Sequence, residues 1–174
     1  QLDASVNLVP IMEGQGGEIQ NLTWIGWGPP AQDDFFMFDA DPNTIYLGDG
    51  HFAAHGPKSK ALTFDFGARL LLERIRFYPR EQHFVDRFVE SFRIGISDGD
   101  PLKDGTRDIV VGQRGIELDF DVVYEISENT DAVIDLELPA VPIRRLLFEA
   151  DENTRGVWEV AEFEIYGNGF APFA

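Results

Sequence analysis

Apolar and polar residues alternate in several short segments of the chain. A period of two places alternate side chains on opposite faces of an extended strand, so these segments predict half-buried β-strands. The alternating segments are residues 62–66, 75–78, 92–97, 134–138 and 161–166. Each is followed by turn-forming residues, namely Gly67, Pro79, the pair Asp98-Gly99, Pro139 and Gly167. We therefore expect short strands that end at these positions.

One further strand is expected from a continuous apolar run at Leu146, Leu147 and Phe148. Such a run predicts a strand that is covered on both faces. No long stretch keeps a helical period, and 17 Gly and 10 Pro divide the chain at intervals that suit short strands. The expected fold class is all-β, a jelly-roll β-sandwich.

The pattern also indicates how the chain is organised. We expect a single domain over residues 1–167, whose first part, residues 1–30, is Gly-rich and less patterned. Residues 99–115 are polar and Gly-rich, which predicts a long connection. Residues 168–174 read as the start of a linker, so we expect the domain to belong to a larger multidomain protein.

Composition supports an independent core and excludes some chemistry. The 174 residues are 44% apolar and include 15 Phe and 3 Trp, enough for a substantial buried core. The chain has no Cys, which excludes disulfides, thiolate catalysis and cysteine-bound zinc. No apolar run approaches the length of a membrane span, so we expect no membrane insertion.

The charge of the chain narrows the choice of partners. With 31 Asp and Glu against 14 Lys and Arg, the formal net charge is −17. This argues against nucleic acid, because binding to phosphates depends on cationic side chains. It also argues against anionic membrane surfaces. It is compatible with cation binding, with neutral ligands and with solubility outside the cell, while an ordinary acidic surface is the alternative.

Oxygen-bearing side chains are closely spaced in residues 39–44, DADPNT. Carboxylate, amide and hydroxyl oxygens suit a hard cation such as Ca²⁺. The segment begins like an EF-hand loop, but Thr44 stands where Gly is needed and Gly50 where Glu is needed. Because no helical pattern flanks it, we expect a cation loop between strands. The alternative is an Asx-type turn, in which Asp39 and Asp41 bond their own backbone.

Three enzyme-like signals carry little weight. Residues 95–99 match Gly-x-Ser-x-Gly, but that motif must connect a strand to a helix, and Asp100-Pro101 and a Gly-rich loop follow here. His51 and His55 are four residues apart, but flanking Gly and Pro disfavour a zinc-binding helix. Carboxylate pairs are numerous by chance, and none has a context that would raise a pKa for acid–base work. We therefore expect no enzyme.

Five segments follow one another in a recognisable order. They are residues 39–44 (DADPNT), 61–67 (ALTFDFG), 75–80 (IRFYPR), 91–99 (SFRIGISDG) and 158–167 (WEVAEFEIYG). Together they resemble the landmarks of the discoidin, or coagulation factor 5/8 type C, superfamily. These are galactose-binding-like jelly rolls that include many bacterial carbohydrate-binding modules. The resemblance covers roughly residues 36–167 and implies a galactose-binding-domain-like sandwich.

The chain departs from the family pattern at several positions. Ala40 replaces the usual Gly, Ile45-Tyr46 stands where Thr-x-Trp is usual, and no Trp follows Asp98-Gly99. The disulfide that clamps the ends of animal members is absent. The chain is therefore expected to be a divergent member, whose ligand specificity cannot be carried over from the family.

The resemblance implies a structural calcium ion. In the family, the loop that corresponds to residues 39–44 wraps the ion, and a Glu of the last strand completes its shell. The ligands implied here are Asp39, Asp41, Thr44 and Glu162. In its strand Glu162 lies on the face opposite to the apolar residues, so it need not enter the apolar core. The ion would tie the early part of the chain to the last strand and stabilise the fold by linkage.

The resemblance also implies a sugar site on loops at one end of the sandwich. The Arg of the Pro-Arg landmark often contributes in the family, and here it is Arg80. Candidates of suitable type, with an aromatic face or hydrogen-bond donors, are Trp27, His51, Arg80, His83 and Phe84. The alternatives remain open: Trp24 and Trp27 can pack in the core, and Arg80 can pair with a surface acid.

The leading hypothesis is a non-catalytic, extracellular carbohydrate-binding module with a structural calcium site, carried by a secreted or cell-surface protein. The alternative is a structural or adhesion domain that contacts another surface protein. The acidic surface and the Phe-rich ends would support such contacts, at Phe35, Phe36, Phe170 and Phe173. Asn21-Leu22-Thr23 fits the N-glycosylation pattern, and whether Asn21 is glycosylated stays open.

Overall fold

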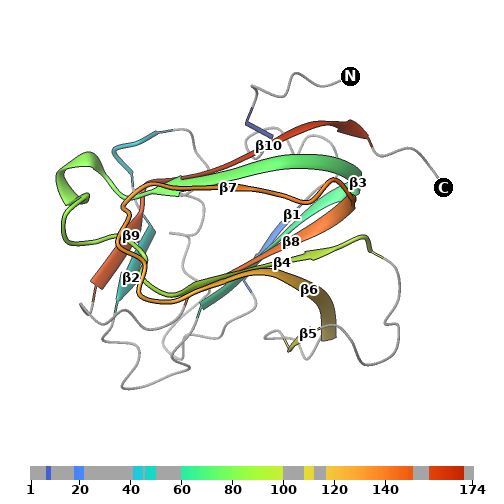
Figure 1. Ribbon diagram of the computed structural model, residues 1–174, viewed down its shortest axis with the longest axis horizontal. Coiled ribbons are helices and arrows are strands. Elements are labelled where there is room, and N and C mark those ends of the chain that lie inside the picture. The colour runs from blue at the N-terminus through green and yellow to red at the C-terminus, as the bar shows by residue number, and fades with distance from the viewer. Residues whose placement is uncertain are drawn as a thin grey trace.

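Antiparallel strands in two layers make up the computed structural model of the protein (Figure 1). The structure describes residues 7–8, 18–21, 41–44, 46–49, 60–99, 108–111, 117–150 and 157–170. Its strands are β1 (Glu18–Asn21), β2 (Tyr46–Asp49), β3 (Lys60–Tyr78), β4 (Phe92–Ser97), β5 (Asp108–Val111), β6 (Glu117–Ile126), β7 (Ile134–Glu137), β8 (Pro142–Ala150), β9 (Val157–Val160) and β10 (Glu162–Phe170). A short 3-10 helix, η4 (Glu81–His83), follows β3. The expected all-β sandwich is confirmed.

The long strand β3 takes part in both layers. Its first part pairs with β1 and β8, in a sheet of order β1-β3-β8-β4-β6-β5. Its second part pairs with β7 on one side and β10 on the other. In Figure 1 these three strands, β10, β3 and β7, run side by side along one edge of the molecule. The separate pair β2–β9 lies at one end.

The predicted end of a strand at Gly67 is wrong. Segments 62–66 and 75–78 belong to the single strand β3, which passes through Gly67 without ending. Gly67 has φ of 73°, a left-handed conformation that favours Gly, and the pairing register with β8 shifts between Asp65 and Leu70. The chain therefore bends at Gly67 and crosses from one layer to the other.

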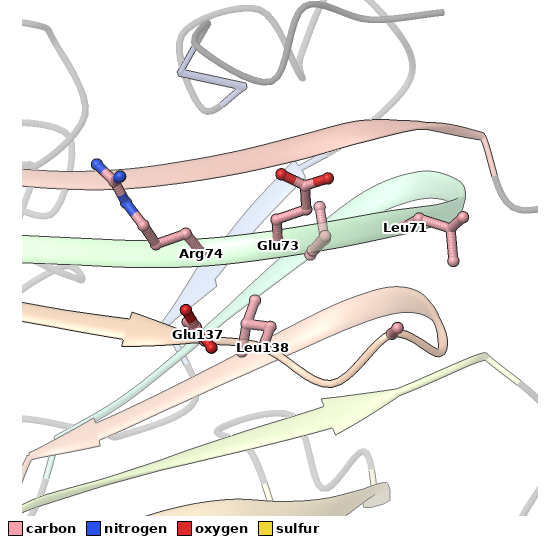
Figure 2. A pocket seen from close by; sticks show the side chains of 7 residues that line it. Leu71, Glu73, Arg74, Glu137 and Leu138 are labelled. Carbon is pink, nitrogen blue, oxygen red and sulfur yellow. The ribbon is translucent and has the colours of Figure 1, made fainter.

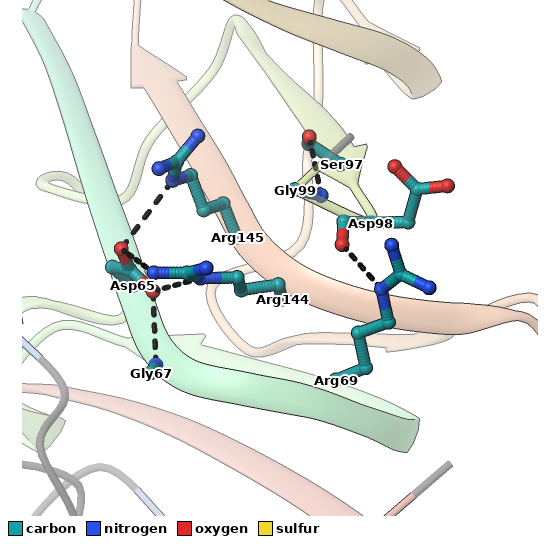
Figure 3. Close-up of polar contacts among 8 residues, drawn as sticks. All are labelled: Asp65, Gly67, Arg69, Ser97, Asp98, Gly99, Arg144 and Arg145. Carbon is teal, nitrogen blue, oxygen red and sulfur yellow. Dashed lines mark hydrogen bonds and ion pairs between the residues drawn. The ribbon is translucent and has the colours of Figure 1, made fainter. Parts of the chain in front are cut away.

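A cluster of polar side chains holds this bend (Figure 3). The Asp65 carboxylate accepts hydrogen bonds from the backbone N–H of Gly67 (2.9 Å), from Arg144 Nε (3.1 Å) and from Arg145 Nε (3.4 Å). Burial raises the pKa of Asp65, but the hydrogen bonds from Arg144 and Gly67 and the charges of both arginines outweigh it, so the pKa lies below its usual value. The carboxylate therefore stays ionised at neutral pH.

Most of the other predicted strands are present. Residues 92–97 form β4, residues 134–137 form β7, and the apolar run at residues 146–148 lies in β8. All three residues of that run are buried, which confirms a strand covered on both faces. The turn at Asp98-Gly99 is also confirmed, since Gly99 has φ of 83° and its N–H donates to Ser97 Oγ at 3.1 Å. The Gly-x-Ser-x-Gly match is thus a turn at the end of a strand.

Several elements differ from the prediction. Strand β5 lies within residues 99–115, which were expected to form only a connection. Trp158 belongs to β9 rather than to the closing strand, and β10 continues to Phe170. The less patterned first 30 residues contain β1 and the buried Leu8, whose N–H donates to Ile165 O at 2.8 Å. Short strands of this kind carry too few alternating residues to be recognised by period.

Aromatic residues fill the core between the layers. Phe77 of β3 stacks on Phe163 of β10 with ring centroids 5.1 Å apart, and its edge meets Phe92 at 5.1 Å and Phe148 at 5.2 Å. Phe64 stacks on Phe163 at 5.3 Å. This cluster joins residues from four strands across the two layers. In the described part of the chain, no helix has the length and apolar character needed to cross a membrane.

Candidate functional site

A surface groove lies where β3 ends and the chain turns into η4. It has a volume of about 810 Å³. Its lining comes from three separate parts of the chain: Pro42, Asn43, Arg76, Tyr78, Pro79, Arg80, Glu81, Gln82, Phe84 and Val133. The groove therefore combines guanidinium, amide, hydroxyl and carboxylate groups with two aromatic rings and two proline rings.

The turn that carries half of this lining follows from its sequence. Pro79 has no N–H to donate to a neighbouring strand, so β3 ends at Tyr78. Arg80 then has φ of −58° and ψ of 147°, and its carbonyl accepts a hydrogen bond from His83 N–H at 2.8 Å. The resulting helical turn places Phe84 on the groove.

Arg80 lines the groove and also holds a buried carboxylate. Its Nε and Nη2 donate to Glu159 Oε1 and Oε2, respectively, each at 3.2 Å, and its backbone N–H donates to Oε1 at 3.1 Å. Glu159 is 0% exposed, whereas the Arg80 side chain is 29% exposed. The hydrogen bond with Glu159 raises the pKa of Arg80. Arg80 therefore pairs with an acid, but with a buried one rather than with the surface acid of the alternative. The bidentate pair fixes the direction of the guanidinium.

Tyr78 and Arg76 form the groove wall on β3. The Arg76 guanidinium lies 5.1 Å from the centroid of the Tyr78 ring, and Tyr78 OH donates to Glu164 Oε1 at 3.4 Å. Burial, followed by the charges of Glu164 and Glu162, raises the pKa of Tyr78 to about 12. The hydroxyl is therefore a stable hydrogen-bond donor at neutral pH. Period-two alternation within residues 75–80 could have identified Arg76, Tyr78 and Arg80 as one outward-facing set.

His83 was predicted as a ligand-binding residue, but it does not line the groove. Its Nδ1 lies 3.1 Å from Asp86 Oδ1, and its side chain is only 19% exposed. Phe84, the next residue, does line the groove. Of the predicted ligand-binding residues, Trp27 and His51 lie outside the described part of the chain, as do Trp24, Phe35, Phe36 and Phe173.

The described part of the predicted cation loop forms a tight turn. Asp41 Oδ1 accepts hydrogen bonds from the backbone N–H and from Nδ2 of Asn43, both at 2.9 Å. Thr44 Oγ1 donates to the Asp41 carbonyl at 3.0 Å. These are the contacts of the Asx-turn alternative. The oxygen atoms of the loop, from carboxylate, carbonyl and hydroxyl groups, are nevertheless of the kind that binds Ca²⁺.

The other part of the predicted metal site lies on β10. Glu162 is the register partner of Tyr78, and Tyr78 lines the groove together with Pro42 and Asn43. The turn at residues 41–44 and the start of β10 thus flank the same end of β3. Glu162 is 3% exposed, so it is buried although it faces away from the apolar side of β10. No group of three or more Asp, Glu, His or Cys within the described ranges could hold a metal, and Asp39 lies outside them.

No known family profile matches the chain, and no curated protein sequence matches it. The fold does match solved structures. The module CpGH89CBM32-5 of Clostridium perfringens, in complex with GalNAc-β-1,3-galactose, superposes with a TM-score of 0.60 at 13% identity, over 93% of this chain and 100% of that chain. The protein has the galactose-binding-like, discoidin-type fold. The order of motifs in the sequence predicted this fold, and it is confirmed.

Two further matches agree with the discoidin-type fold. The family 32 module of C. perfringens NanJ, in complex with galactose, has a TM-score of 0.55 at 15% identity, over 90% of this chain and 96% of that one. A chitosan-binding module of Paenibacillus sp. IK-5, in complex with chitotriose, has a TM-score of 0.56 at 14% identity, over 95% of this chain and 100% of that one. At these identities the likeness is one of fold.

Proposed function

We propose that this discoidin-type domain is a non-catalytic carbohydrate-binding module of a secreted or cell-surface protein. The observation that carries the proposal is the groove beside Arg80, on a fold whose solved neighbours are carbohydrate-binding modules. Its volume of about 810 Å³ is ample for a sugar unit.

The lining chemistry fits a polyhydroxylated ligand. Arg76 and Arg80 supply planar donors, while the amides of Asn43 and Gln82 both donate and accept. The Phe84 ring supplies an apolar surface against which the C–H face of a sugar can pack. Because Glu159 holds Arg80 in place, little side-chain entropy is lost when Arg80 contacts a ligand.

Calorimetric titration tests the proposal with galactose, chitotriose and GalNAc-β-1,3-galactose, followed by a glycan array. Phe84→Ala and Gln82→Ala are expected to weaken binding at least about tenfold, which is about 1.4 kcal/mol. Val85→Ala is the matched control, because Val85 is 80% exposed, adjoins Phe84 and does not line the groove. If no glycan binds, or if the three variants behave alike, the groove is not a sugar site.

We also propose that a calcium ion is held by residues 39–44 and Glu162. Asp39, Asp41 and Thr44 would contribute loop oxygens, and Glu162 would contribute a carboxylate from β10. The placement of Pro42 and Asn43 beside Tyr78, the register partner of Glu162, supports the proposal. The ion would join the loop to the last strand through the carboxylate of Glu162.

Thermal unfolding tests the calcium proposal. Excess EDTA is expected to lower Tm, and added Ca²⁺ is expected to restore it, because an ion that binds only the folded state stabilises that state. Asp41→Asn should reduce the response to Ca²⁺, whereas Glu125→Gln, at an exposed position of β6, should leave it unchanged. An identical Tm with EDTA and with Ca²⁺ would rule the site out.

A further inference from the structure

The outer face of the layer β7–β3–β10 presents a regular row of polar and aromatic side chains. Arg74 and Arg76 of β3 both point outward from it. In register, Arg76 lies between Asp135 of β7 and Glu164 of β10, and Arg74 lies between Glu137 of β7 and Tyr166 of β10. Each arginine thus has an acidic register partner on β7. On β10, the register partner of Arg76 is an acid and that of Arg74 is a tyrosine.

Contacts across the strands hold these side chains in place. Arg74 Nε lies 3.1 Å from Asp135 Oδ1, and the Arg74 guanidinium lies 4.9 Å from the centroid of the Tyr166 ring. Arg76 Nη1 lies 3.8 Å from Glu164 Oε2. The face therefore offers guanidinium groups that contact side chains of the neighbouring strands, together with two tyrosine rings, Tyr78 and Tyr166.

A second groove opens on the same layer beside Arg74 (Figure 2). It has a volume of about 390 Å³ and is lined by residues 71–74 of β3 and by Glu137, Leu138 and Ala140. A hydrogen bond from Leu138 N–H to the Glu73 carbonyl, 2.8 Å long, joins the two sides of this groove. In Figure 2 the side chains of Glu73 and Arg74 project from β3, and Glu137 lies at the end of β7.

The two grooves follow one line along the sheet. Arg76 lines the first groove and Arg74 the second, and these two residues are neighbours on one face of β3. On the neighbouring segment, Val133, which directly precedes β7, lines the first groove, and Glu137 of β7 lines the second. From Leu72 to Tyr78, where β3 ends, the line covers six residue steps, about 20 Å at a rise of roughly 3.3 Å per residue.

We propose that the ligand is an extended oligosaccharide that lies along β3 and spans both grooves, rather than a single terminal sugar. This inference rests on the proposed function. The line is several times longer than one sugar ring, and it offers hydrogen-bond donors and acceptors throughout. The exposed Glu73, Asp135 and Glu137 add negative charge to an already acidic chain, so the oligosaccharide carries no acid groups.

Calorimetry with ligands of two lengths tests this inference. The probes are chitobiose and chitohexaose, and β-1,4-galactobiose and β-1,4-galactohexaose. In the series that binds, the hexasaccharide is expected to bind at least about tenfold more tightly than the disaccharide, which is about 1.4 kcal/mol. An oligogalacturonate of the same length is expected to bind more weakly than the neutral hexasaccharide.

A longer oligosaccharide can also bind a short site more tightly for a purely statistical reason, because it can occupy that site in more ways. A variant distinguishes contact along β3 from this statistical effect. Arg74→Ala should bring hexasaccharide affinity down to near that of the disaccharide and leave disaccharide affinity unchanged. The Arg74 side chain is 45% exposed, so the fold should tolerate its loss. Arg93→Ala is the control, because Arg93 pairs with Glu149 between β4 and β8, in the other layer.

Each outcome has a distinct meaning. Equal affinity for the two lengths, or a hexasaccharide advantage that persists in Arg74→Ala, overturns the extended site and leaves the proposed sugar groove intact. Tighter binding of the oligogalacturonate overturns the inference that the ligand lacks acid groups. Absence of binding by all the probes and by the glycan array overturns both the extended site and the proposed function.

Discussion

Arg80 has two roles that its position in the sequence could not separate. It lines the candidate groove, and it neutralises Glu159, which is buried below the turn. A buried carboxylate without a cation is strongly unfavourable, so the pair is needed for the fold whatever the groove binds. For this reason Phe84 and Gln82, rather than Arg80, are the informative positions for tests of ligand binding.

Replacement of Arg80 is expected to destabilise the protein. Arg80→Ala should lower the free energy of unfolding by about 3–5 kcal/mol, because it leaves the Glu159 carboxylate buried without its partner. Urea denaturation at pH 7 measures the change. Adding Glu159→Gln to the variant should recover part of the loss, since the amide carries no charge. A loss below about 1 kcal/mol for Arg80→Ala would contradict the assigned role of the pair.

Tyr78 is expected to make the protein sensitive to alkali. Its pKa is raised to about 12 in the folded state, above the ordinary value of 10.0, so the folded protein holds this proton more tightly than the unfolded chain does. The free energy of unfolding should therefore fall as pH rises from about 10 to about 12. Tyr78→Phe should remove part of this fall, as measured by urea denaturation over that range. An equal fall in both proteins would show that Tyr78 does not cause it.

At the scale of elements, the bend in β3 decides how the two layers are joined. Gly67 permits the bend, and Asp65 holds it through Arg144 and Arg145 (Figure 3). The stem of Arg144 in turn lies against Gly99, where an added Cβ would come within 2.7 Å of Arg144 Cδ. The bend and the turn after β4 therefore depend on each other, and both need a Gly.

Asp65→Asn is expected to weaken this bend. At pH 7 the substitution should lower the free energy of unfolding by about 1–3 kcal/mol, because two guanidinium groups lose a charged acceptor. The pKa of Asp65 is lowered in the folded state, so its stabilising effect is present above the unfolded value of about 3.9 and is lost as pH falls through the lower folded value. The difference in the free energy of unfolding between wild type and variant, measured by urea denaturation, should therefore become smaller below about pH 4.

The exposed pair Arg74–Asp135 provides the comparison for this variant. Its side chains are 45% and 44% exposed, so Asp135→Asn should lower the free energy of unfolding by less than about 1 kcal/mol. If Asp65→Asn and Asp135→Asn have the same effect at pH 7, the Asp65 cluster is not a special support of the bend.

At the scale of the whole molecule, one aromatic cluster holds the two layers together. Phe77 and Phe163 come from the layer that carries the grooves, and Phe92 and Phe148 come from the other layer. The stability of the domain and the shape of the face that carries the grooves are therefore linked through β3, whose alternate residues serve the core and the surface.

Two Phe→Ala variants distinguish a phenylalanine that stabilises the core from one that lines the surface groove. Phe77→Ala should lower the free energy of unfolding by about 3–5 kcal/mol, because the ring is 1% exposed and packs against three other rings. Phe84→Ala should change stability much less and should weaken sugar binding instead. Urea denaturation and calorimetry on both variants check this, and a reversed pattern would place Phe84 in the core.

Much of the fold could be predicted because the evidence for it is local. The strands at residues 92–97 and 134–137 follow from alternation, and the ends at Pro79 and Asp98-Gly99 follow from the chemistry of those residues. The order of five motifs was enough to identify the discoidin-type fold. Gly67 misled the prediction, because a left-handed Gly can bend a paired strand as well as end one, and only the partner strands decide between the two.

The sequence by itself determined the strands that alternate clearly, the fold class and the residue types available for binding, since these depend on near neighbours along the chain. Only the tertiary structure decided which of those residues meet. Arg80 and Glu159 are 79 positions apart, and the groove gathers Asn43, Tyr78 and Val133 from three segments. Contacts between distant positions depend on strand pairing and on the bend in β3, and no local pattern records them. The row of side chains along β3 exists for the same reason, because β7 and β10 pair on either side of it.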